Sequence, residues 1–270
     1  MTPLAKRTAL VTGASSGIGA IYADRLAHRG YDLILVARNR GRLDELAKRL
    51  TGETGRAVEA VTADLSYKAD LGRIETLLRA DVSITMLVNN AGVGALGTLL
   101  ETSIDITDDM IALNVTALTR LTYAAAPGFV SRGGGTIINI ASILGIAPEI
   151  LNGVYGGTKA FVLAFSLSLH KELAEKGVRI QAVVPGATAT DFWEKGGVTV
   201  ENLPGGTVMA AEEMVDAALA GLDQGELITI PSLPDAADWQ AYENARQVLL
   251  PNLSRSSAAD RYRVACQTAA

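Results

Sequence analysis

Apolar residues recur along this chain in two alternating patterns. Short runs rich in β-branched residues, such as TALVTG (8–13) and GTIINIAS (135–142), alternate with longer segments whose apolar residues return every three to four positions. The first pattern is typical of buried strands and the second of amphipathic helices. Because parallel strands need crossover helices, the alternation predicts one doubly wound parallel sheet.

Seven strands with helices between them follow from this pattern. The strands are expected at 8–13, 31–38, 56–65, 84–92, 135–142, 178–186 and 226–230, and the helices at 17–30, 41–50, 69–80, 108–125, 151–173 and 210–222. We therefore predict an α/β fold, a single Rossmann-type catalytic domain over residues 1–230 whose sheet is flanked by helices. Residues 231–270 are expected to form a C-terminal helical extension, with Trp239, Tyr242 and Leu249 on one helical face.

Composition narrows the classes of function. The formal net charge is −5 and no long basic run occurs, which argues against a nucleic-acid partner. No run of about 18 apolar residues could span a membrane, and the N-terminal apolar run is too short for a signal peptide. The single cysteine, Cys266, cannot form an internal disulfide, and no Cys/His spacing predicts a metal site. A cytoplasmic protein with no membrane or metal requirement is expected.

A glycine-rich turn joins the first strand to the first helix. In VTGASSGIGA (11–20), Gly13 allows a tight turn, Gly17 lets the main chain approach a pyrophosphate, and Gly19 lets helix pack on strand. The helix N-terminus then offers N–H groups to the anion. The spacing GxxxGxG departs from the usual GxGxxG, so a purely structural turn stays an alternative. The flanking strand and helix favour dinucleotide binding.

The end of the second strand indicates which dinucleotide is bound. An acidic residue there would bind the ribose 2′-OH of NAD, whereas an arginine accommodates the 2′-phosphate of NADP. This chain has Arg38 at that position, followed by Asn39. Because a guanidinium binds phosphate through paired, charge-assisted hydrogen bonds, NADP (NADPH) is favoured over NAD. The alternative is that Arg38 is a solvated charge at a strand end.

Seven motifs in sequence order resemble those of the short-chain dehydrogenase/reductase family, over about residues 6–230. They are TGASSGIG (12–19), DL (64–65), NNAG (89–92), an asparagine (114), a serine (142), YGGTK (155–159) and PGATAT (185–190). The resemblance implies a catalytic set of Ser142, Tyr155 and Lys159, aided by Asn114, with a nicotinamide dinucleotide as hydride carrier. It also implies a homodimer or homotetramer.

The resemblance further implies a set of cofactor contacts. It places Asp64 by the adenine, 90–92 along the ribose, and 188–190 near the nicotinamide amide and phosphates. The full set expected to contact the cofactor is Gly13, Ser15, Ser16, Gly17, Ile18, Gly19, Arg38, Asn39, Asp64, Leu65, Asn90, Ala91, Gly92, Tyr155, Lys159, Pro185, Gly186, Thr188 and Thr190.

The spacing of Tyr155 and Lys159 suits acid/base chemistry. Carbonyl reduction requires a proton donor near the oxygen, and free tyrosine has a pKa of about 10. Lys159 lies four residues after Tyr155 on the same helical face, where a cation favours the tyrosinate. Ser142 is expected to donate a hydrogen bond to the substrate oxygen, and Asn114 resembles the family residue that holds a water for proton relay. The alternatives are a chance Tyr/Lys pair and a serine that only caps a turn.

Three segments expected near the site are mostly apolar: VGALG (93–97), ILGIAPEIL (143–151) and DFWEKGG (191–197). They predict a hydrophobic pocket for a ketone, aldehyde or secondary alcohol. Residues 190–207 are expected to form a lid in which Phe192 and Trp193 cover the substrate, ordinary packing of both rings being the alternative. In YGGTK, Gly156 and Gly157 are expected to keep the cleft open for ribose or substrate, with tight helix packing as the alternative.

The sequence thus favours an NADP(H)-dependent oxidoreductase that transfers hydride between nicotinamide and a hydrophobic carbonyl or alcohol, with tyrosine as general acid/base. The main alternative is a noncatalytic NADP(H)-binding regulatory protein, which would have no chemical need for Ser142, Tyr155 and Lys159 together. An epimerase or dehydratase acting on a nucleotide sugar would be expected to carry a larger C-terminal domain than residues 231–270.

Overall fold

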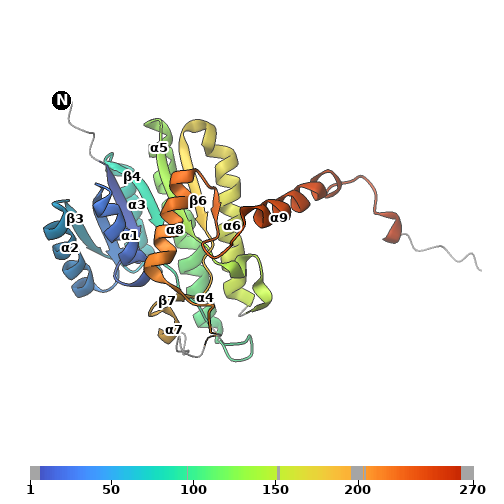
Figure 1. Cartoon of the computed structure of the whole chain (residues 1–270), viewed down its shortest axis with the longest axis horizontal. Helices are drawn as coiled ribbons and strands as arrows, with labels where there is room; N and C mark the ends of the chain where they lie inside the picture. The colour runs from blue at the N-terminus through green and yellow to red at the C-terminus, as the bar shows by residue number, and fades with distance from the viewer. Residues whose placement is uncertain (1–6, 96, 151–152, 196–202, 204, 263–270) are drawn as a thin grey trace, which may run out of the picture. The chain divides into compact units, whose positions relative to one another are not determined.

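The computed structural model describes residues 7–262 except 96, 151–152, 196–202 and 204. It divides the chain into two units, Met1–Ser232 and Leu233–Ala270. In the first unit, seven parallel strands form one sheet in the order β3-β2-β1-β4-β5-β6-β9 (Figure 1). The predicted doubly wound α/β fold is confirmed.

Each strand of this sheet lies within its predicted range. The strands are β1 (Thr8–Thr12), β2 (Asp32–Ala37), β3 (Val58–Thr62), β4 (Ile84–Asn89), β5 (Gly135–Ile140), β6 (Val178–Val183) and β9 (Ile228–Thr229). The helices are α1 (Gly17–His28), α2 (Arg40–Thr54), α3 (Lys68–Ala80), α4 (Ile104–Ile111), α5 (Leu118–Ser131), α6 (Gly153–Leu173) and α8 (Ala211–Gln224). The hydrophobic periodicity of the sequence therefore located the elements that build the core.

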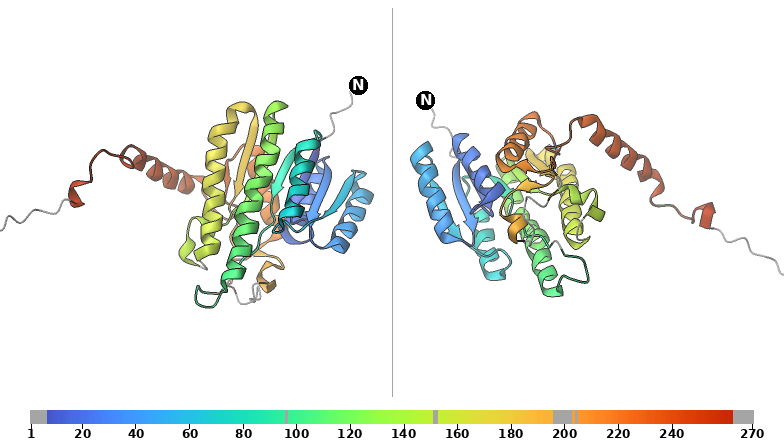
Figure 2. Two further views of the ribbon diagram at one scale, coloured as in Figure 1. Left: turned by 180° about the vertical axis from the view of Figure 1, so that it is seen from behind. Right: turned by 60° about the horizontal axis from the view of Figure 1, so that its bottom comes forward.

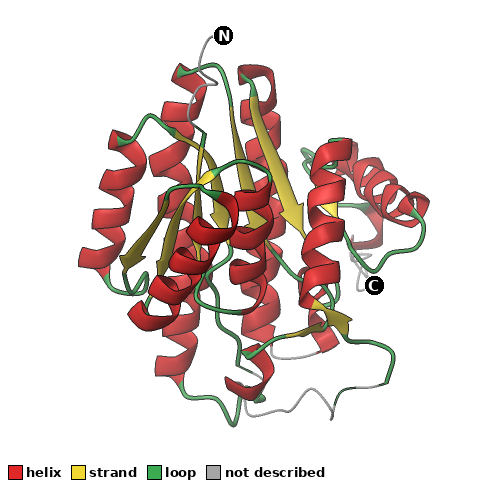
Figure 3. Cartoon of the chain, turned by 60° about the vertical axis from the view of Figure 1, so that its left-hand side comes forward, coloured by secondary structure: helices red, strands yellow, loops and turns green. Residues whose placement is uncertain are grey.

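Alternate side chains of each strand point to opposite faces of the sheet, and each face packs against its own helices. In β1, Ala9 and Val11 join a buried cluster with α1, α2 and α8, whereas Leu10 joins a cluster with α3, α5 and α6. Figure 2 shows α3, α5 and α6 over one face in its left panel, and Figure 3 shows the sheet between helical layers. Burial on both faces explains why the strands read as continuous apolar runs.

The strand order reverses between β1 and β4, each of which pairs with the other. In open parallel sheets, ligands bind beyond the carboxyl ends of the strands at such a reversal, because the loops there diverge. Most of the predicted site residues lie in the loops that follow β1 to β6. The fold therefore places the predicted residues at the edge where a dinucleotide would be expected.

Three short features differ from the sequence prediction. A two-stranded ribbon pairs β7 (Thr188–Ala189) with β8 (Met209–Ala210), and a single turn of helix, α7 (Phe192–Lys195), follows β7. The helix predicted over 108–125 consists of α4, a π-helical turn η1 (Ala112–Ala117) and α5. The strands β7 and β8, the turn α7 and the π-helical turn η1 are too short to show a hydrophobic period of their own, so sequence periodicity does not reveal them.

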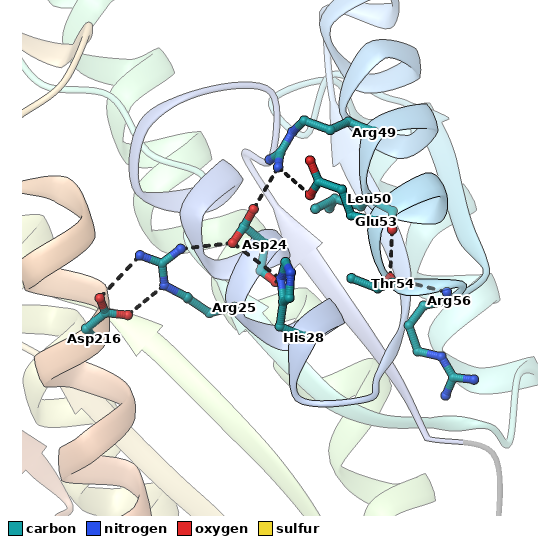
Figure 4. A network of polar contacts seen from close by, with 9 residues as sticks. All are labelled: Asp24, Arg25, His28, Arg49, Leu50, Glu53, Thr54, Arg56 and Asp216. Atoms are coloured by element: carbon teal, nitrogen blue, oxygen red, sulfur yellow. Dashed lines mark hydrogen bonds and ion pairs between the residues drawn. The ribbon is translucent and has the colours of Figure 1, made fainter.

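Ion pairs join α1, α2 and α8 on the outer side of one helical layer. Asp24 of α1 accepts hydrogen bonds from Arg25 and from Arg49 of α2, both at 2.9 Å (Figure 4). Arg25 in turn donates to Asp216 of α8 at 2.7 Å. His28 Nδ1 lies 3.6 Å from an oxygen of Asp24. The carboxylate of Asp24 thus has basic groups on several sides.

The second unit contains α9 (Ala236–Leu249), followed by the short turns η6 (Leu250–Asn252) and η7 (Asp260–Tyr262). Trp239 and Tyr242 stack on each other with ring centroids 5.2 Å apart. Throughout the described parts of both units, every helix is too short or too polar to cross a bilayer. Nor do three or more His, Cys, Asp or Glu side chains of those residues gather where a metal ion could be held.

Candidate active site

The structure brings the predicted catalytic and cofactor residues to the carboxyl edge of the sheet. Tyr155 and Lys159 come from α6, and Asn114 comes from η1. The remaining residues follow strands: Gly13, Ser15, Ser16, Gly17, Ile18 and Gly19 after β1, Arg38 and Asn39 after β2, Asp64 and Leu65 after β3, Asn90, Ala91 and Gly92 after β4, Ser142 after β5, and Pro185, Gly186, Thr188 and Thr190 after β6.

Asn90 holds the glycine-rich turn from the neighbouring loop. Its Nδ2 donates to the carbonyl oxygens of Thr12 at 2.9 Å and Gly13 at 3.3 Å. A Cβ at Gly13 would lie 2.8 Å from Asn90 Nδ2, and a Cβ at Gly19 would lie 2.4 Å from the Gly13 oxygen. Gly13 also has φ of 67°. Packing and backbone conformation inside the protein therefore already require these two glycines.

The start of α1 is suited to an anion. Ser16 precedes the helix but makes no capping hydrogen bond, and no acidic residue occupies the first turn. The first N–H groups of α1 therefore keep the positive end of the helix dipole available. A Cβ at Gly17 would lie 3.1 Å from the Thr190 methyl group, so the loop after β6 passes beside the turn. This cradle fits the pyrophosphate of a dinucleotide.

Arg38 and Asp64 lie side by side beyond the ends of β2 and β3. Arg38 Nη1 is 4.0 Å from Asp64 Oδ2, and the Arg38 side chain is 68% exposed. Arg40, in contrast, binds Asp44 with Nε and Oδ2 2.6 Å apart. Asn39 accepts a hydrogen bond from a main-chain N–H of α2 and caps that helix. On this turn, Arg38 is therefore the guanidinium that keeps its donors available for a ligand.

Asn114 joins the loop after β4 to α6. Its Oδ1 accepts from the Val93 N–H at 2.9 Å, and its Nδ2 donates to the Val93 oxygen at 2.8 Å and to Thr158 Oγ1 at 3.2 Å. A Cβ at Gly92 would lie 3.1 Å from Asn114 Oδ1 and 3.6 Å from Lys159 Nζ. These bonds engage the Asn114 amide in positioning this loop beside Lys159. Its water-holding role stays a prediction.

Tyr155, Ser142 and Lys159 lie together in the interior. Their exposed fractions are 9%, 7% and 6%. Tyr155 and Ser142 form a side-chain hydrogen bond. Lys159 Nζ donates to the Ile140 carbonyl oxygen at 2.9 Å and lies 5.7 Å from the centroid of the Tyr155 ring. The three residues named from the sequence as a catalytic set are therefore brought into one buried group.

Burial dominates the electrostatics of this group. It raises the pKa of Tyr155 to about 12, while the hydrogen bond with Ser142 acts in the opposite direction. Burial also lowers the pKa of Lys159 to about 8. Desolvation of the phenolate thus outweighs the hydrogen bond with Ser142. The effect of the Lys159 cation on the tyrosinate stays a prediction. At neutral pH Tyr155 is thus protonated, the form that can donate a proton.

Apolar side chains from all three predicted segments meet at Tyr155. The cluster contains Ala95, Met110, Leu144 and Tyr155, with Val93, Ile143, Val154 and Phe192 packed against it. Trp193 is 9% exposed. Of the lid predicted over 190–207, residues 196–202 and 204 lie outside the described part of the chain. The described residues beside Tyr155 therefore form a largely hydrophobic surface.

The two glycines of YGGTK have different surroundings. A Cβ at Gly156 would lie 2.9 Å from Pro148 Cβ and 3.2 Å from the Leu144 oxygen, so close packing requires glycine there. The prediction that Gly156 keeps a cleft open is wrong. A Cβ at Gly157 would meet nothing within 4 Å, so the structure has open space at Gly157, as the sequence prediction requires.

Sequence reasoning missed two features near the site. Arg42 of α2 binds Asp191 with Nη1 and Oδ2 3.0 Å apart. This ion pair connects α2 to the segment that follows β7. Gly94 lies directly against Phe192. The only sequence signal for either was the position of Gly94 two residues beyond the NNAG motif. Leu65, expected to contact the cofactor, is 5% exposed and packs in the core, which leaves its main chain for that role.

Comparisons with known proteins agree with this geometry. A family model described as short chain dehydrogenase matches residues 7–199. A short-chain dehydrogenase from Sphingobium yanoikuyae, solved in complex with NADPH, is 51% identical, with a TM-score of 0.93 over 95% of this chain and 100% of its own. A bulky-bulky ketone specific alcohol dehydrogenase from Comamonas testosteroni is 46% identical, with a TM-score of 0.88 over 96% and 99%. An uncharacterized oxidoreductase from Staphylococcus epidermidis is 34% identical over 78% of this chain and 93% of its own.

Proposed function

The chain belongs to the short-chain dehydrogenase/reductase family of oxidoreductases, and we propose that it is an NADP(H)-dependent member acting on hydrophobic ketones, aldehydes or secondary alcohols. The observation that carries the proposal is the joint burial of Tyr155, Ser142 and Lys159 at the edge that holds the glycine-rich turn. A regulatory protein that only binds the dinucleotide would have no chemical use for that group.

Each member of the buried group has a role in carbonyl reduction. A dinucleotide held by the 13–19 turn, Arg38 and Lys159 supplies hydride when bound. Tyr155, protonated at neutral pH, gives its proton to the carbonyl oxygen, and its phenolate takes a proton from the alcohol in the reverse direction. The Ser142 hydroxyl donates a hydrogen bond to the same oxygen. The Lys159 cation favours the phenolate that remains after the transfer.

Arg38 supports NADP as the cofactor. Its guanidinium is exposed beside Asp64 without a hydrogen bond at ordinary distance, so it can bind a 2′-phosphate with paired donors. The Sphingobium yanoikuyae relative was solved with NADPH. NAD would instead be favoured by a carboxylate at this position, which binds the ribose 2′-OH, and this chain has Arg38 there.

The apolar cluster at Tyr155 supports a hydrophobic substrate. The Comamonas testosteroni relative is described as specific for bulky-bulky ketones, and we propose ketones with two sizeable apolar substituents for this protein as well. A homodimer or homotetramer and a cytoplasmic location stay predictions.

The proposal is tested by following NADPH and NADH oxidation with a panel of apolar ketones. We expect the wild type to prefer NADPH and Tyr155→Phe to lose about 100- to 10,000-fold in kcat, because the proton donor is gone. Tyr123→Phe removes the hydroxyl of a tyrosine that is 69% exposed on α5 and serves as the matched control. NADPH binding by Tyr155→Phe, followed by fluorescence, shows that the variant is folded.

Equal rates for wild type and Tyr155→Phe would refute the assigned proton donor. If the wild type binds NADPH but oxidises it with none of the ketones, the regulatory alternative is correct instead. Faster oxidation of NADH than of NADPH would contradict the role given to Arg38.

A further inference from the structure

The ring of Phe192 is the aromatic surface that faces Tyr155 in the described part of the site. Phe192 begins α7, and its ring centroid lies 5.8 Å from that of Tyr155. It also contacts Trp193 edge to face, at 5.7 Å and 85°. Phe192 is only partly buried beside the proposed proton donor.

Neighbouring residues hold Phe192 from both sides. Before it, Asp191 pairs with Arg42 of α2 at 3.0 Å. After it, the Trp193 indole N–H donates to the Thr188 carbonyl oxygen at 2.9 Å, and the indole is 9% exposed. A buried aromatic with its polar group satisfied is a rigid anchor. Both sequence neighbours of Phe192 are therefore held by contacts with other segments, which limits how far its main chain can move.

Gly94 provides the space in which the ring lies. A Cβ at Gly94 would lie 2.4 Å from Phe192 Cζ and 3.1 Å from Cε2, a distance that no side chain can occupy unless the ring moves. Gly94 is absent from the glycines with positive φ, so its backbone conformation does not require glycine. The three nearest atoms to such a Cβ all belong to the Phe192 ring, so this ring is what requires glycine at the position.

We infer that Phe192, packed against Gly94, is the specificity-determining residue of this site and selects ketones that carry a flat aryl substituent. The inference rests on the proposed function. The rigid ring, with its centroid 5.8 Å from that of the tyrosine that protonates the carbonyl, offers an aryl group of the substrate an offset or edge-to-face contact. A puckered aliphatic ring of the same carbon number cannot make that contact. Phe192 touches the substrate's substituent rather than its reacting oxygen, so it affects selection more than chemistry.

The test compares butyl phenyl ketone with butyl cyclohexyl ketone, which both carry two sizeable apolar substituents and differ in the flatness of one six-carbon ring. We expect the wild type to favour butyl phenyl ketone in kcat/KM with NADPH. Phe192→Leu keeps an apolar side chain but removes the flat ring, so the ratio of the two kcat/KM values should fall by about 3- to 10-fold. The change should lie mainly in KM, because Tyr155 and Lys159 are untouched.

A double-mutant cycle tests whether Gly94 provides the space in which the Phe192 ring lies. Gly94→Ala should lower kcat/KM for butyl phenyl ketone by about tenfold in the wild-type background, because the added methyl displaces Phe192. In the Phe192→Ala background the same substitution should cost less than about twofold, because no ring is left to displace. Gly72→Ala, at a helical glycine of α3 with nothing within 4 Å, is the control and should leave activity unchanged.

Two outcomes overturn the inference while the proposed function stands. One is a wild type that reduces ketones but whose substrate ratio is unchanged in Phe192→Leu. The other is a Gly94→Ala effect of equal size with and without Phe192. If the wild type reduces no ketone with NADPH, the proposed function fails and the inference fails with it. Thermal unfolding and NADPH fluorescence of each variant confirm that a lost activity is not a lost fold.

Discussion

Lys159 and Asp24 show two opposite treatments of a charged group in one domain. Asp24 lies in the outer helical layer, where Arg25 and Arg49 donate to it at 2.9 Å and His28 lies 3.6 Å away. Lys159 is 6% exposed at the carboxyl edge of the sheet, and its ammonium donates to the Ile140 carbonyl oxygen. No carboxylate of the described residues pairs with Lys159.

The pKa values of the two groups reflect this difference. Burial raises the pKa of Asp24, but hydrogen bonds from Arg49 and Arg25 outweigh burial and lower it overall. Burial lowers the pKa of Lys159 to about 8, and no carboxylate of the described residues pairs with the ammonium to counter this. An uncompensated buried charge reduces stability. We interpret Lys159 as a charge kept for chemistry and the Asp24 network as one kept for holding helices together.

Arg38 and Arg40 differ in the same way, because only Arg40 is closely paired with a carboxylate. Substituting Arg38 should have the largest effect on cofactor preference. Arg38 lies 4.0 Å from a carboxylate oxygen, whereas Arg40 is bound to Asp44 at 2.6 Å. Arg38→Asp should lower the preference for NADPH over NADH by about 10- to 100-fold, the value of a lost charge-assisted bond to phosphate. Arg40→Gln should leave the preference within about twofold. The measurement is kcat/KM for each cofactor at fixed ionic strength. Equal effects of the two substitutions on cofactor preference would contradict the distinction between Arg38 and Arg40.

Asp24→Asn should have a smaller effect, and on stability alone. We expect a loss of about 1–2 kcal/mol in the free energy of unfolding, because several basic groups lose a shared partner. Since the pKa of Asp24 is lowered in the folded state, its contribution is present above about pH 4 and is lost as pH falls through the folded pKa. The difference between wild type and variant in urea unfolding should therefore shrink in acid.

The control for this prediction is Asp223→Asn. Asp223 pairs with Arg29 at 2.9 Å, is 59% exposed, and should contribute less than about 0.5 kcal/mol. An Asp24→Asn variant with reduced turnover but unchanged stability would reverse the interpretation of the network.

The sequence was sufficient to locate the sheet and the edge where the site lies. Buried strands and amphipathic helices have different hydrophobic periods, and Arg38, Asp64 and Ser142 follow strands that this period reveals. Strands of a parallel sheet end on the same side, so residues after different strands come together without further information.

Features that depend on contacts between distant residues could not be predicted in this way. Gly156 packs against Pro148, and Gly94 accommodates Phe192, but neither partner is adjacent in the sequence. The turn α7 depends on the bond from Trp193 to Thr188 rather than on helix propensity. The raised pKa of Tyr155 likewise follows from burial, which the four-residue spacing to Lys159 does not reveal.

The most direct test of the account is the free energy of unfolding of wild type and Lys159→Met, measured in urea between pH 7 and pH 10. Methionine fills a similar volume without a charge, so the variant should be at least as stable as wild type at pH 7, yet nearly inactive with NADPH and a ketone. The pKa of Lys159 is lowered from 10.5 to about 8 in the folded state, so the unfolded chain holds the extra proton within that window. The stability of wild type relative to the variant should therefore rise above pH 8 by up to about 1.4 kcal/mol per pH unit. A difference that stays constant with pH, or a variant that loses stability at pH 7 while keeping its turnover, would contradict the claim that Lys159 is a buried charge kept for catalysis.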